Sequence, residues 1–100
     1  MPENPLSTAN KIDPQVVDHM RSTDDWVFSD GAISRKVKLL IAMAFDAAHG
    51  AAGGVKGLAQ RATNEGATKE EIAEVLRVAY VMTGVGAIYI GSQGLKELFP

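Results

Sequence analysis

The fold is decided by residues 34–50, which read SRKVKLLIAMAFDAAHG. Apolar side chains recur in this stretch at the three- and four-residue spacings that mark one face of an α-helix. They are Val37, Leu40, Ile41, Ala44, Phe45 and Ala48. Ser34 is a residue type that caps helix starts, and Gly50 is one that ends them. The stretch therefore predicts an amphipathic helix that runs from Ser34 to His49.

Upstream of this helix, Asp13 and Pro14 form a helix start, because Asp caps the first turn and Pro suits the first helical position. Residues 1–12 hold two of the four prolines and show no apolar period. They are expected to form a flexible N-terminal arm. Residues 13–100 show no internal boundary and are expected to form a single helical domain.

Three more helices are predicted downstream. The glycine-rich run at residues 50–54 interrupts the pattern, and a helix follows from Val55 to near Gly66. Residues 68–71, TKEE, match a capping box that opens the next helix. A last helix is expected between Gly86 and about Phe99. Because no strand alternation or hairpin signal occurs, the fold class is all-α, a compact bundle of about five helices.

Composition narrows the function. The 100 residues are 46% hydrophobic and 22% charged, carry a net charge of −2 and contain no cysteine. Without cysteine, disulfides, thiolate metal sites and thiol redox catalysis are excluded. The weakly acidic balance offers no basic surface to nucleic acid. No leader peptide or membrane span is recognisable, so a cytoplasmic protein without a membrane partner is expected.

Residues 78–90 carry apolar side chains on every helical face. A helix that is apolar all round is normally buried all round, and a 100-residue body is too small to bury one fully. The chain is therefore expected to associate with other copies of itself through helical interfaces.

Three further segments follow the helix at residues 34–50 in a recognisable order: GATKEEI at 66–72, EVLRVAY at 74–80 and TGVGA at 83–87. Together they resemble the carboxymuconolactone decarboxylase family, which includes the alkyl hydroperoxidase D-like proteins. The resemblance covers residues 26–98. It implies an all-α fold of the alkyl hydroperoxidase D-like type, assembled as a homotrimer or homohexamer with the active site near subunit interfaces.

The resemblance also locates the family's catalytic positions. In the thiol branch, a Glu lies upstream of a C-x-x-C-x-x-x-H segment. Counted back from Gly66, the two cysteine positions fall on Ala51 and Gly54. The histidine position falls on Leu58, in the decarboxylase branch as well, and the glutamate position on Leu39. A thiol peroxidase needs a thiolate and a resolving thiol, so this chain is expected to lack that activity.

Asp46 and His49 are the candidate catalytic residues, because a carboxylate three residues before an imidazole on a helix can orient a base. The alternative is structural: His49 lies near a helix C-terminus, where the helix dipole favours it. No second carboxylate–histidine pair completes a ligand set, so no metal is expected. No other cofactor is expected either.

Arg35, Lys56 and Tyr80 are the candidate substrate-binding residues. Arginine holds carboxylates in bidentate fashion, and Lys56 follows the glycine-rich run where backbone N–H groups could meet an anion. The alternatives are solvated cations on a helix face and, for Tyr80, packing in the core or an interface.

Two hypotheses about function follow. In the first, the chain is a decarboxylase- or lyase-like enzyme that acts on a small anionic organic acid or lactone at a subunit interface. In the second, it is a non-catalytic helical oligomer or small-ligand-binding protein that has lost the family's chemistry. The first requires His49 to face a pocket shared with Arg35, Lys56 or Tyr80.

Overall fold

A computed structural model describes residues 4–100 of the chain, and these residues form six α-helices. The helices are α1 (Ser7–Ile12), α2 (Pro14–Val27), α3 (Arg35–Ala48), α4 (Ala52–Asn64), α5 (Lys69–Thr83) and α6 (Gly86–Leu95). No strand occurs within residues 4–100. The all-α prediction is therefore confirmed.

The three predicted helix caps are present. The side chains of Asp13, Ser34 and Thr68 each accept a hydrogen bond from the backbone N–H three residues later, at 3.1, 3.2 and 3.1 Å. The Glu71 carboxylate in turn accepts from the Thr68 N–H at 2.9 Å, which completes the capping box. Local sequence thus fixes where α2, α3 and α5 begin.

Two helix boundaries differ from the prediction. Helix α4 begins at Ala52, three residues before the predicted Val55, because the two glycines of its first turn adopt helical geometry. Helix α6 ends at Leu95 rather than near Phe99. Gly66, with φ of +94°, follows α4 in the left-handed conformation that favours glycine. It marks the predicted end of that helix.

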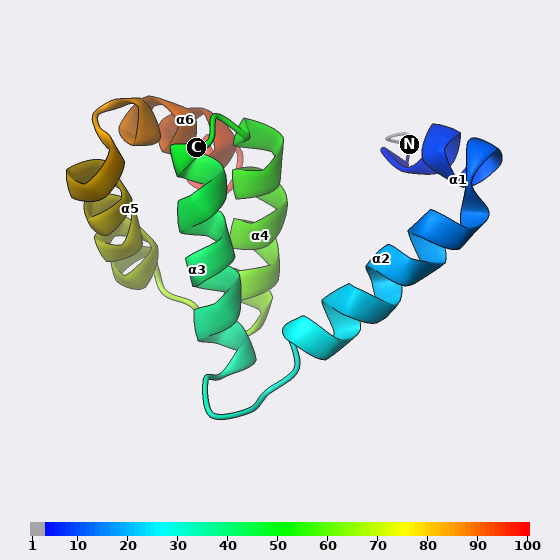
Figure 1. The fold of residues 1–100 in the computed structure, drawn as a ribbon. Helices are drawn as coiled ribbons and strands as arrows, with labels where there is room; N and C mark the ends of the chain where they lie inside the picture. Colours follow the sequence, from blue (N-terminus) through cyan, green and yellow to red (C-terminus); the bar gives the residue numbers. More distant parts are fainter. Residues whose placement is uncertain (1–3) are drawn as a thin grey trace.

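Helices α3 to α6 form a bundle around one hydrophobic core (Figure 1). Helix α3 lies centrally and contacts α4, α5 and α6. The core consists of buried apolar residues from all four helices and from the loop before α5. They are Leu39, Leu40, Met43, Ala47, Val55, Ala59, Ala62, Ala67, Ile72, Ala79, Ala87 and Leu95. This bundle is the frame that positions any functional site.

Helices α1 and α2 project away from the bundle, and we call residues 4–27 the arm (Figure 1). Its attachment lies at the C-terminal end of α2, where Asp24 Oδ2 accepts a hydrogen bond from Arg61 Nη2 at 2.8 Å. The same guanidinium lies 5.1 Å from the ring centroid of Phe28. The Cα radius of gyration, 14.2 Å, exceeds the ~13 Å of a compact domain of this length, as a projecting arm requires.

The arm contains a helix that the sequence did not predict. Residues 1–12 were expected to form a flexible N-terminal arm, and within the described part of that segment residues 7–12 form α1, which packs against α2. Residues 1–3 of that segment lie outside the described residues. The apolar residues in the first half of α2 are largely uncovered: Val17 is fully buried, whereas Val16 and Met20 are 42% and 46% exposed.

Candidate functional site

A long apolar groove runs between α3 and α5, with a cavity volume of about 740 Å³. We call it the α3–α5 groove. Ten apolar and three polar residues line it: Val37, Leu40, Ile41, Ala44, Phe45, Ala48, Val75, Val78, Ala79, Met82, Glu71, Glu74 and Thr83. Its volume falls in the usual range for ligand pockets, and its lining is far more apolar than polar.

Two of the three polar residues of the groove have partners within the chain. Glu71 Oε2 accepts a hydrogen bond from Lys36 Nζ at 2.9 Å, and this bond, together with the Thr68 N–H, holds the pKa of Glu71 below its ordinary value. The Thr83 hydroxyl donates to the Ala79 carbonyl at 2.7 Å. Of the two carboxylates that line the groove, Glu74 is the one whose side chain forms no ion pair within residues 4–100. The groove therefore favours apolar surfaces over charged ligands.

Asp46 and His49 lie at the C-terminal end of α3. The Asp46 carboxylate packs directly on the backbone of Gly54 in the first turn of α4, where only glycine leaves room for it. A carboxylate is favoured there by the positive end of the helix dipole. His49 is the C-terminal cap of α3 and is exposed, with its ring 6.3 Å from that of Phe45. No hydrogen bond joins Asp46 to His49 in the described chain.

The predicted anion-binding residues are paired with carboxylates of the same chain. Arg35 Nε donates to Glu65 Oε1 at 2.9 Å, and Arg35 Nη1 donates to the Phe28 carbonyl at 3.2 Å. Lys56 Nζ lies 2.7 Å from Glu97 Oε2, and the hydrogen bond between them lowers the pKa of Glu97. Each of these cations therefore already has a carboxylate partner within its own chain.

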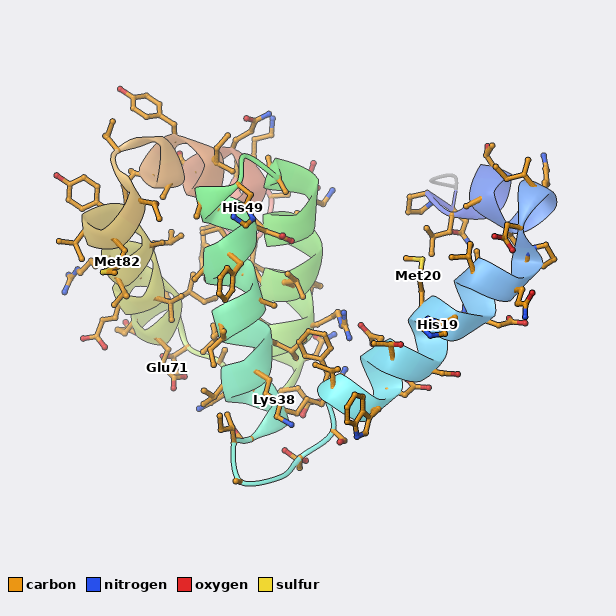
Figure 2. The ribbon with its side chains drawn as sticks, viewed as in Figure 1. His19, Met20, Lys38, His49, Glu71 and Met82 are labelled. Atoms are coloured by element: carbon orange, nitrogen blue, oxygen red, sulfur yellow. The ribbon has the colours of Figure 1, made fainter. Side chains whose placement is uncertain are left out.

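One chain does not bring the five predicted site residues into one pocket. Arg35 and His49 are fourteen residues apart at opposite ends of α3, roughly 21 Å along a helix axis. Figure 2 shows this separation, with His49 at one end of α3 and Lys38, near Arg35, at the other. Tyr80 is half-exposed on α5 and does not line the α3–α5 groove.

The positions that correspond to the family's catalytic residues carry no reactive group. Leu39 is fully buried in the core, and Leu58 is partly buried against it. Gly54 has no side chain, and Asp46 fills the space beside it. Across residues 4–100, no three histidine or carboxylate side chains are grouped as metal ligands would be. None of the helices in that part of the chain has the length and hydropathy to cross a membrane.

Sequence reasoning missed the α3–α5 groove. The sequence predicts one apolar face for α3 and does not say what that face contacts, and Val37, Ile41 and Phe45 on its outer edge are exposed. Glu71 and Glu74 are not among the predicted site residues, but both line the groove. The width of the α3 stripe, in which pairs of adjacent residues are apolar, is the signal that could have indicated a second packing surface.

Comparison with known proteins agrees with this fold. The profile of the Carboxymuconolactone decarboxylase family matches residues 14–89. A crystal structure of an apo carboxymuconolactone decarboxylase family protein from Legionella pneumophila is 30% identical in sequence, with a TM-score of 0.83. The similarity covers 91% of this chain and 81% of the Legionella chain. No curated protein matches the sequence.

Proposed function

Because this chain belongs to the carboxymuconolactone decarboxylase family, we propose that it is a helical homo-oligomer, a trimer or hexamer, that has kept the family's fold without its thiol chemistry. Self-association is the function that the geometry supports best. The family's redox chemistry requires cysteine, and the sequence contains none.

The observation that carries this proposal is the amount of apolar surface that a single chain leaves uncovered. Large apolar side chains are exposed on the arm, on the outer edge of α3, and along α5 and α6. Met82 is 76% exposed, Tyr89 73% and Trp26 78%. Exposed apolar residues of α3 and α5 adjoin one another along the α3–α5 groove, and exposed apolar patches mark sites of association. Other copies of the same chain would cover them.

Replacement of Tyr89 with Asp tests this proposal. A charge at a buried interface position is costly to desolvate, so the variant is expected to shift the oligomer toward monomer in size-exclusion chromatography with light scattering. Tyr89→Phe is the matched control, since it keeps the ring and should keep the wild-type mass. An unchanged mass for the Asp variant would remove this part of α6 from the interface.

A second candidate function is decarboxylase- or lyase-like action on a small organic acid or lactone at a subunit interface. The observation in its favour is the position of His49, which is exposed beside Phe45, a residue of the α3–α5 groove. Asp46 lies one turn earlier on the same helix. For this function, a neighbouring copy would have to supply a carboxylate-binding group beside His49, because Arg35, Lys56 and Tyr80 do not share a pocket with it within one chain.

Turnover of a carboxymuconolactone, the kind of lactone acid after which the family is named, separates the two candidates. A general acid–base at His49 predicts turnover that falls by about 100-fold or more in His49→Asn. The homo-oligomer proposal predicts no turnover by either protein. Equal turnover by both would exclude His49 as the acid–base.

A further inference from the structure

Helix α2 has no partner for its apolar face within its own chain. It packs against the short helix α1, and only its C-terminal end is joined to the bundle, through Asp24 and Arg61. Val16, Met20 and Val27 lie on one side of the helix and are all more than 40% exposed. A helix of 14 residues is marginal in water without tertiary packing. This face therefore requires a partner.

The α3–α5 groove matches α2 in length and character. A 14-residue helix is roughly 21 Å long, and the groove runs along most of α5, from Glu71 to Thr83, which is roughly 18 Å. Its centre is formed by Ile41, Val78 and their apolar neighbours. A single helix laid between α3 and α5 would bury both apolar surfaces at once.

Charge also suits this pairing. Arg21 follows Met20 on α2, and Glu74 is the groove carboxylate without a partner. Neither residue takes part in an ion pair inside the described part of its own chain. The two groups can therefore pair across an interface without the loss of an existing bond.

We propose that α2 of a second copy of this chain lies in the α3–α5 groove, with Met20 near Val78 and Arg21 near Glu74. This inference rests on the proposed self-association and adds which surfaces meet. Each copy offers one arm and one groove, so the contacts can close as a two-fold pair or as a ring. In Figure 2, Met20 and the groove residue Met82 lie on opposite sides of the molecule, so the contact is between copies.

The comparison structure supports the projecting arm. The bundle and its loops make up fewer than three quarters of this chain, whereas the Legionella crystal structure matches 91% of it. The match therefore extends into the arm.

The absence of cysteine makes this contact directly testable by disulfide trapping. In a Met20→Cys/Val78→Cys double variant of the full chain, oxidation with copper–phenanthroline should link two chains, because a disulfide forms only where Cα atoms come within about 7 Å. The readout is the fraction of protein at dimer mass or above on a non-reducing gel. We expect most of the protein to be linked and the link to disappear on reduction.

Met20→Cys/Ala73→Cys is the matched control. Ala73 is exposed on α5 and turned away from the groove, at about 140° from Val78 around the helix. This variant should give little linkage. Equal linkage in both variants, or a Val78 link that runs at monomer mass, would overturn the arm-in-groove contact. Sedimentation of the unoxidised proteins distinguishes this failure from that of the proposed function: an oligomer without the Val78 link refutes only the contact, whereas a monomer refutes both.

Discussion

The contact between α4 and α6 gives a sharp test of the bundle, because it depends on the absence of a side chain at Gly94. A Cβ added at Gly94 would lie 2.7 Å from the Ala52 carbonyl oxygen and 2.7 Å from both Cβ and Cγ1 of Val55. Two of these three atoms belong to the backbone or to the stem of a branched side chain, so rotation of a flexible group does not relieve the overlap. The Gly94→Ala substitution therefore forces α6 away from α4.

The magnitude follows from two opposing effects. Overpacking of a core costs about 1–3 kcal/mol, and alanine recovers about 0.5–1 kcal/mol relative to glycine inside a helix. The net loss is about 0–2.5 kcal/mol, or about 1 kcal/mol at the middle of both ranges, and each kcal/mol lowers the Tm by roughly 4–8 °C for a domain of this size. Thermal unfolding followed by circular dichroism measures it, at one fixed protein concentration because oligomers unfold in a concentration-dependent way.

Two other helical glycines provide controls. A Cβ at Gly91 would meet the two Cδ atoms of Leu76 at 2.9 and 3.0 Å, at the end of a flexible side chain, so Gly91→Ala should cost less than Gly94→Ala. A Cβ at Gly57 would meet nothing within 4 Å, so Gly57→Ala should stabilise the protein by about 0.5–1 kcal/mol. If Gly94→Ala were as stable as Gly57→Ala, α6 would not pack on α4 as described.

Three further predictions concern the candidate site. Hydrogen peroxide with a thiol reductant should give no turnover above buffer, because the sequence contains no cysteine. Enzymatic consumption of peroxide would refute the assignment of Ala51 and Gly54 to the family's two cysteine positions. The hydrogen bond from Lys36 lowers the pKa of Glu71 in the folded chain, so this bond stabilises the fold above the ordinary carboxyl pKa of 4.5. The stabilisation is lost as the pH falls through the lowered pKa of the folded state. The Tm difference between wild type and Glu71→Gln should therefore shrink on acidification, and a constant difference would contradict this. Gly54→Ala should destabilise the chain by about 1 kcal/mol, at the low end of overpacking costs, because the group it displaces is the carboxylate end of the Asp46 side chain. The same change in an Asp46→Ala background should be nearly neutral in denaturant unfolding; equal costs in both backgrounds would show that the two positions are not in contact.

Much of the fold was predictable because its signals are local. The caps at Asp13, Ser34 and Thr68 depend on residues three positions apart, and each forms as the sequence indicates. Helix α1 was missed because it is six residues long and buries no side chain, so it leaves no apolar period. Its formation depends on contact with α2, which a local pattern does not encode.

The candidate site was less predictable because it depends on which helices lie side by side. Arg35 and Lys56 are predicted to bind an anion, and the sequence does not show that the bundle places Glu65 and Glu97 beside them. These partners are 30 and 41 residues away in sequence, at distances where spacing carries no information. The α3–α5 groove likewise exists only because the apolar stripes of α3 and α5 face each other with a space left between them.

Sedimentation velocity of the wild-type chain over a range of concentrations tests the central claim most directly, because one 10.6 kDa chain leaves so much of α2, α5 and α6 uncovered. We expect a single species at a small multiple of the chain mass, three- or sixfold, that persists on dilution. A stable, dispersed 10.6 kDa particle at every concentration would contradict both the self-association and the arm-in-groove contact.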